Sequence, residues 1–208
     1  MADNVAITAG SGTNIATDDD GGVHYQEVKI MAGADGTFTG DVAGRTVDGG
    51  SGAALYVDPR PKAVRLAVTP TISSGAVYAA KDAIGALMTF SNAARASGGS
   101  IWIDRVQVLD KGQQMATLDL VLFDRTLTAP TDNAAFDPTD AELATAVAVV
   151  PIIAADYKDF NDNSLADRPV GVEAVLNGTD LFGVLVARST PTYTSTSDIV
   201  VTLTLLQD

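Results

Sequence analysis

The stretch that decides the fold is Asp198-Ile199-Val200-Val201-Thr202-Leu203-Thr204-Leu205-Leu206. β-Branched residues and leucines run through it without a glycine or proline, a composition typical of a β-strand. Comparable strand signals occupy residues 64–68, 87–90, 101–109, 118–122, 147–153, 170–174 and 181–187. About eight strands with one short helix predict an all-β fold, a β-sandwich or jelly roll.

The segment 101–109 breaks the simple alternation of a strand. Its apolar residues change parity, with one set formed by Trp102, Val106 and Val108 and the other by Ile101 and Ile103. We expect either a β-bulge near Asp104 and Arg105 or a strand buried on both faces. Trp102, the sole tryptophan, is interpreted as a core residue.

Three other segments carry weaker signals. In residues 78–90, apolar residues at helical spacing are interrupted by Gly85, and we favour a strand over 87–90. Asp137 is interpreted as an N-cap followed by Pro138, which predicts a short helix over 137–143. Asn177-Gly178 predicts a tight turn between two strands, and residues 156–168 a polar loop.

The beginning of the chain follows different rules. Residues 1–55 hold 11 of the 19 glycines, acidic clusters and few large apolar side chains. Such a segment has little apolar surface to bury and must find order on another surface. With the prolines near residues 58–61 as the boundary, we expect an extended N-terminal arm over 1–58 and a β-sandwich domain over 59–208.

Within this arm, residues 1–22 are expected to be irregular and residues 23–30 form one candidate strand. A lone strand leaves its backbone groups unpaired, so we expect it to add to a sheet of its own domain or of a neighbour. The predicted contact residues for a partner are Val23, His24, Tyr25, Val28, Lys29 and Ile30.

Charge and composition exclude several classes of protein. The net charge is −13, of which residues 1–55 contribute −6 and residues 56–208 contribute −7. No run of basic residues is present, so we expect no nucleic-acid partner and no binding to anionic membranes. The sequence has no cysteine, no apolar run long enough to span a membrane and no secretory signal, so we expect synthesis in the cytoplasm of the host.

The sequence carries only weak signals for a catalytic site. His24, the only histidine, lies in the arm, where a polar contact is the favoured interpretation over a triad or a metal site. Four acids on or beside strands could form a glycosidase pair, but aromatic platforms for sugars are scarce; these acids are Asp104, Asp110, Asp119 and Asp124. We therefore predict no catalytic residues, no cofactor and no enzymatic activity.

Residues 159–164 begin like a calcium loop. Ser164 stands where an EF-hand needs glycine and Val170 where it needs glutamate, so an EF-hand is rejected. A looser calcium site using Asp156, Asp159 and Asp162 stays open, although an ordinary solvated loop is favoured and no metal site is predicted.

Four segments carry a resemblance to a known family, in the kind of residues they contain and in their order along the chain: residues 21–29, 83–95, 98–101 and 181–208. Together they resemble structural proteins of tailed bacteriophages, and most closely the capsid decoration (cement) family. That resemblance implies a jelly-roll body on the outer capsid surface of the virion, with extensions that clamp neighbouring major capsid subunits, and no catalytic residues. It also implies a homo-oligomer, with a trimer favoured and a dimer possible.

The alternative is a tail or baseplate structural module that binds a receptor or carbohydrate. Such a module needs a cluster of exposed aromatic side chains, and the candidates are Tyr157, Phe160 and Tyr193.

Overall fold

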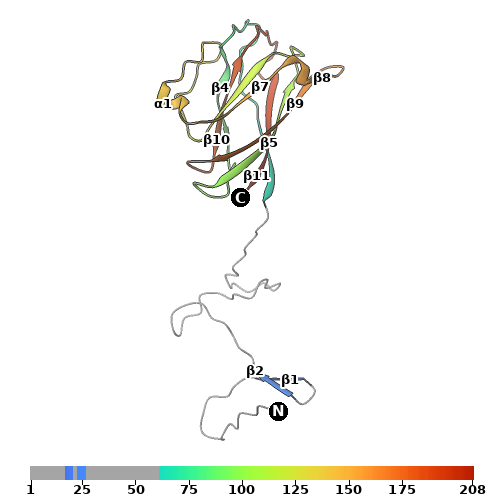
Figure 1. The fold of residues 1–208 in the computed structure, drawn as a ribbon. Coiled ribbons are helices and arrows are strands. Elements are labelled where there is room, and N and C mark those ends of the chain that lie inside the picture. Colours follow the sequence, from blue (N-terminus) through green and yellow to red (C-terminus); the bar gives the residue numbers. More distant parts are fainter. Residues whose placement is uncertain (1–16, 21–22, 27–60) are drawn as a thin grey trace. The chain divides into compact units, whose positions relative to one another are not determined.

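The computed structural model describes residues 17–20, 23–26 and 61–208. The chain falls into two units, Met1–Asp58 and Pro59–Asp208. The described part of the first unit is an antiparallel pair of strands, β1 (Thr17–Asp20) and β2 (Val23–Gln26). The second unit, called the body below, is all-β, with two antiparallel sheets and one short α-helix (Figure 1).

The body contains nine strands in two sheets. The five-stranded sheet has the order β3-β11-β5-β9-β8, with bounds Lys62–Val68, Ile199–Gln207, Ser100–Asp110, Ser164–Val175 and Tyr157–Asp159. The four-stranded sheet has the order β4-β10-β6-β7, with bounds Ala83–Phe90, Leu181–Ala187, Leu118–Phe123 and Ala146–Ile152. The predicted fold class is therefore confirmed.

The strand order is that of a jelly roll. The chain passes repeatedly from one sheet to the other, and the first strand of the body, β3, lies beside its last strand, β11. Eight strands complete the two four-stranded halves of a jelly roll, and the short β8 adds an edge next to β9. Contacts far apart in the sequence therefore dominate the body.

The apolar stretch from Ile199 onward forms β11, an inner strand of the five-stranded sheet. It pairs along β3 on one side and along β5 on the other. Its inward residues Ile199, Val201, Leu203 and Leu205 are fully buried. Each fully buried aliphatic side chain contributes about 1.5–3 kcal/mol, so this face of β11 is a substantial part of the core.

The predicted bulge in β5 is present at Asp104. Both neighbouring strands skip this residue, because the register moves from Ile103 directly to Arg105 against β9 and against β11. The bulge reverses the parity of the strand, so Ile103 and Val106 both face the core. Trp102 then faces outward and is 41% exposed, so its interpretation as a core residue was wrong.

Three local predictions change in the structure. The strand predicted over 87–90 is β4 and begins earlier, at Ala83. The helix α1 spans only Asp140–Leu143, and its N-cap is Thr139 instead of Asp137. Thr139 and Glu142 form a reciprocal capping box, which satisfies two terminal N–H groups and outcompetes the aspartate two residues earlier.

Two loop predictions also differ. The predicted polar loop over 156–168 contains the end of a 3₁₀ turn (Ala154–Asp156), all of β8 and the beginning of β9. Asn177-Gly178 connects β9 to β10, which lie in different sheets, so it is a bend between the layers and not a hairpin turn.

The outer face of the four-stranded sheet is covered by residues 124–145, here called the strap. Leu127 and Phe136 of the strap pack on a second apolar cluster that includes Val121, Phe123 and Val184. The rings of Phe123 and Phe136 meet edge to face, with centroids 6.4 Å apart.

Asp132 anchors the strap to the sheet. Its carboxylate accepts hydrogen bonds from the Ser73 hydroxyl (2.5 Å), the Tyr78 hydroxyl (2.7 Å) and the Gly85 N–H (2.6 Å). Burial, and then the bond to this carboxylate, raise the pKa of Tyr78. The tyrosine therefore stays protonated and continues to donate to Asp132.

Candidate functional site

The predicted partner-contact residues of the arm divide between described and undescribed positions. Val23, His24 and Tyr25 lie in β2, while Val28, Lys29 and Ile30 lie outside the described residues. β2 pairs with β1 residue by residue, so that Asp20, Asp19 and Asp18 stand opposite Val23, His24 and Tyr25. The expectation of irregular chain up to residue 22 was therefore wrong for Thr17–Asp20.

This pairing changes the interpretation of the segment. A local hairpin supplies the partner that we expected from another sheet, because the two strands are joined by only two glycines and need little loop closure. Among the described residues each of these strands pairs only with the other, so a two-stranded ribbon results. Such a ribbon is marginal in water unless further strands or a surface support it.

Among the described residues, β3 is an edge strand of the body with no strand on its outer side. This strand pairs with β11 over its full length and forms the end of the five-stranded sheet. Its residues are exposed or half-buried throughout, and Lys62 and Arg65 place charges along it. Charged residues on an edge discourage unspecific pairing, whereas the free backbone groups can still accept a specific extended segment.

The four acids weighed for catalysis serve separate structural purposes. Asp119 forms an ion pair with Arg188 (2.6 Å), and Asp124 forms one with Arg125 (2.9 Å). Asp104 is exposed at the bulge of β5, and Asp110 is fully buried at the end of the same strand. Asp119 and Asp124 are held by different arginines, and Asp104 and Asp110 of β5 differ in burial, so the four acids do not form a glycosidase pair.

The acids of the proposed calcium loop are likewise engaged. Asp156 accepts a hydrogen bond from the Ile153 N–H (2.9 Å) and pairs with Arg168 (3.3 Å). Asp159 accepts from the Gln113 side chain (2.9 Å), and Asp162 accepts from the neighbouring Asn161 (2.7 Å). In the described part of the chain, no three His, Cys, Asp or Glu side chains are grouped as metal ligands would be.

The aromatic residues considered for a carbohydrate platform do not share a surface. Tyr157 and Tyr193 are buried in the core, 5% and 0% exposed, whereas Phe160 is exposed in the loop after β8. Tyr193 instead packs edge to face on Tyr78, with ring centroids 6.0 Å apart. The aromatic side chain that does lie on a sheet surface is Trp102, which we had interpreted as buried.

A buried polar cluster at one end of the sandwich was missed by the sequence analysis. Asp110 accepts hydrogen bonds from the N–H groups of Gly112 (3.0 Å) and Met115 (2.8 Å), and Asp198 accepts from those of Thr194 (3.0 Å) and Ser195 (2.9 Å). The two carboxylates thereby fix the loops that precede β6 and β11. Both aspartates directly flank a strand, and a residue type that favours turns at this place was the available signal.

Burial controls the ionisation of this cluster. It raises the pKa of Asp110, an effect that the three N–H donors of Met115, Gly112 and Gln114 partly offset and that the nearby Asp198 reinforces. The hydroxyls of Tyr157 and Tyr193 are buried without a hydrogen-bond partner among the described residues, and burial followed by the charge of Asp110 raises the pKa of both. The cluster therefore holds neutral phenols beside a buried carboxyl group that backbone N–H groups hold in place, which suits a structural role.

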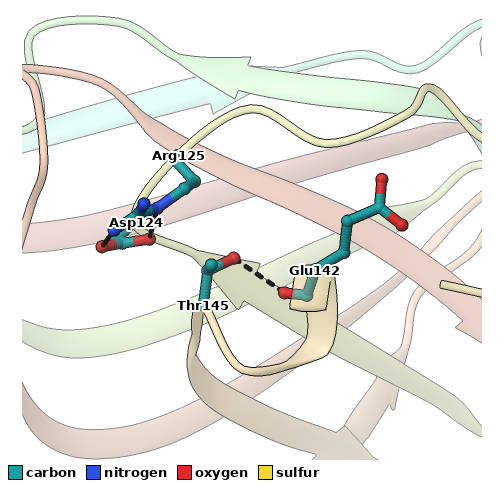
Figure 2. A network of polar contacts seen from close by, with 4 residues as sticks. All are labelled: Asp124, Arg125, Glu142 and Thr145. Atoms are coloured by element: carbon teal, nitrogen blue, oxygen red, sulfur yellow. Dashed lines mark hydrogen bonds and ion pairs between the residues drawn. The ribbon is translucent and has the colours of Figure 1, made fainter. Parts of the chain in front are cut away.

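Polar contacts within the strap hold its two ends and its middle in place. Figure 2 shows Arg125 against Asp124 at its start and the Thr145 hydroxyl donating to the backbone oxygen of Glu142 (2.7 Å) near its end. The carboxylate of Glu142 points away from these residues and accepts from the N–H groups of Thr128 (2.7 Å) and Thr139 (2.9 Å). These bonds lower the pKa of Glu142 to about 2.

The outer face of the five-stranded sheet is not covered by a comparable strap within the body. One row across it consists of Ala63, Leu206, Trp102 and Glu173, which are successive partners on β3, β11, β5 and β9. Next to this row, Arg105 pairs with Asp167 (2.6 Å). A face with small, apolar and paired charged side chains is chemically suited to contact another protein.

Comparison with family models, with curated proteins and with solved structures gave no match to this chain. A helix of the length and apolarity that a membrane span requires does not occur among the described residues.

Proposed function

We propose that this protein is a structural virion protein that decorates a bacteriophage head and stabilises it by clamping neighbouring major capsid subunits. The observation that carries the proposal is the jelly-roll strand order of the body, with β3 beside β11, preceded by a separate unit of 58 residues. Jelly rolls occur chiefly in viral capsid proteins, lectins and cupins. The chemistry of the side chains favours the first of these classes.

The residues of the body support a contact role over catalysis. The only histidine, His24, belongs to the other unit, and the carboxylates at the ends of β5 and β11 are engaged by backbone N–H groups. A catalytic acid or base needs access to substrate, which Asp110 lacks because it is fully buried.

Two features provide the contacts that a clamp needs. The open edge of β3 and the ribbon of β1 and β2 both offer backbone groups that another chain can pair with. Repetition of weak contacts over a lattice raises their combined strength through effective concentration. We infer that the partners are the major capsid protein and further copies of this chain, with a trimer as the favoured oligomer.

Acidity fits the same role. A net charge of −13 keeps a protein of high copy number soluble and keeps it away from packaged DNA. The proposed location is accordingly the outer surface of the head.

The test uses heads of the parent phage assembled without this protein. We expect the full-length chain to bind in a fixed ratio to the major capsid protein and to raise the temperature at which the heads release DNA. A variant that lacks residues 1–58 should bind more weakly and give no such increase, while circular dichroism verifies that its body is folded. Absence of the protein from purified virions, or immunogold labelling of the tail alone, contradicts the proposal.

A further inference from the structure

The inference concerns Trp102 on the outer face of the five-stranded sheet. The side chain is 41% exposed, and Glu173 is its direct partner on the neighbouring strand β9. A Cβ atom placed on Gly171 would stand 3.7 Å from Cζ2 of the indole. The ring therefore lies along the sheet above the glycine of the neighbouring strand and does not project freely into solvent.

A shallow groove of about 220 Å³ opens beside this ring. Its apolar lining comes from Trp102, Leu206 and Pro61, and its acidic lining from Glu173 and Asp208. The Ser100 hydroxyl donates a hydrogen bond to the Asp208 carboxylate and so fixes its position. Among the described residues, Glu173 forms no ion pair and no basic side chain lines the groove.

An aromatic ring, an apolar wall and two carboxylates select for one kind of ligand. A cation is attracted to the face of an indole and to carboxylates, and a long aliphatic stem packs on apolar neighbours such as Leu206. The planar guanidinium of arginine stacks on aromatic rings and binds carboxylates through two parallel donors, which the ammonium of lysine does not do.

We propose that the Trp102 groove binds an arginine side chain presented by a partner protein. The inference rests on the proposed function, since it names the chemistry through which the body contacts a neighbouring virion subunit. The charge complementarity comes from the outward position of the only tryptophan, from the two acids at its sides and from a described lining that holds no basic side chain.

The sole tryptophan also reports on the groove directly. The full-length protein is titrated with the peptide acetyl-Gly-Arg-Gly-amide, and with the citrulline peptide of the same shape but without the charge. We expect the arginine peptide to change the fluorescence of Trp102 in a saturable way and to shift its indole N–H signal in the ¹H–¹⁵N spectrum, and the citrulline peptide to do neither.

Variants of the acids locate the interaction. Glu173→Gln should weaken the apparent affinity about fivefold, which is the factor expected when one charged contact at a partly exposed site is lost. The matched controls Asp162→Asn and Phe160→Ala change an exposed acid and an exposed aromatic ring elsewhere, and both should leave the affinity unchanged.

Three results would overturn the inference: an equal response to the citrulline peptide, an affinity that Glu173→Gln does not alter, or a saturable response to a neutral sugar such as galactose in place of the arginine peptide. The titration contains no virion, so its outcome is independent of whether the protein decorates a head. Conversely, failure of the protein to bind heads would leave a positive titration intact.

Discussion

Replacing Gly85 by alanine tests how the body is packed where β4 meets the loop before it. Gly85 has a φ angle of +79°, and a Cβ atom on it would stand 2.5 Å from Cβ of Pro70. The residue lies in an irregular part of β4, where residues 85–87 face only Val184 between the pairs Ile84–Leu185 and Met88–Gly183. Three residues of β4 therefore oppose one residue of β10, an irregularity that begins with a glycine at positive φ.

The expected loss of stability has two parts. An L-residue at such a positive φ angle costs roughly 1–2 kcal/mol. Carbon atoms in contact prefer about 3.5–4.0 Å, so either Pro70 or the strand must shift, and overpacking of this kind costs typically about 1–3 kcal/mol. The stiffer unfolded chain returns about 0.5–1 kcal/mol. A net loss of about 3 kcal/mol follows, which lowers Tm by about 6–12 °C in a domain of this size.

Thermal unfolding of the full-length protein, followed by circular dichroism, measures this loss. Gly98→Ala is the matched control, because Gly98 has a φ angle of +76° but nothing within 4 Å of its added Cβ atom. The control carries the backbone strain without the clash, and we expect it to cost about 1 kcal/mol or less. If the two variants unfold within about 1 °C of each other, the close contact with Pro70 does not constrain β4 and the reasoning is refuted.

Three further substitutions, two of them with a control variant, test the core and the two carboxyl groups whose pKa is shifted. Leu203→Ala in β11, whose side chain is fully buried, should cost about 2–5 kcal/mol in chemical denaturation, whereas Leu206→Ala on the outer face should cost about 1 kcal/mol or less. The pKa of Glu142 falls from 4.5 to about 2 on folding, so its contribution to folding stability is present above pH 4.5 and is lost as the pH falls toward 2. Glu142→Gln should therefore abolish that part of the decrease of Tm at acid pH, and the control Asp140→Asn should retain it. The pH dependence that Asp110 gives to folding stability has the opposite sign, because burial raises its pKa above the ordinary 3.8. Its contribution declines as the pH rises from 3.8 toward the raised pKa. Curves of Tm against pH for Asp110→Asn should lack that decline.

The strands of the body could be predicted because their residues repeat with a clear period. β11 and β6 match their predicted segments closely, and of the two alternatives offered for the irregular parity of 101–109, a bulge or a strand buried on both faces, the structure has the bulge. The error over Trp102 came from keeping one parity for the whole strand. A bulge at Asp104 reverses the faces on either side of it, so Trp102 and Val106 cannot share a face once the bulge is accepted.

Other features could not be predicted from local patterns. The pairing of β3 with β11 joins segments at opposite ends of the body, and nothing in either segment specifies the other. The packing of the strap could not be predicted from its own sequence either, because Leu127 and Phe136 are buried only by contact with the outer face of the four-stranded sheet. The N-cap of α1 could have been predicted from the sequence, since Thr139 and Glu142 have the spacing of a capping box.

The two outer faces of the sandwich differ in what covers them. The apolar outer residues of the four-stranded sheet, such as Val121 and Phe123, are covered by the strap of the same chain. The outer row of the five-stranded sheet leaves Trp102 substantially exposed beside Leu206, although burying an indole is among the most favourable contributions a contact can make. Since the body covers one face by itself and leaves a tryptophan on the other, we expect its partner contacts on the five-stranded sheet, where the open edge of β3 also lies.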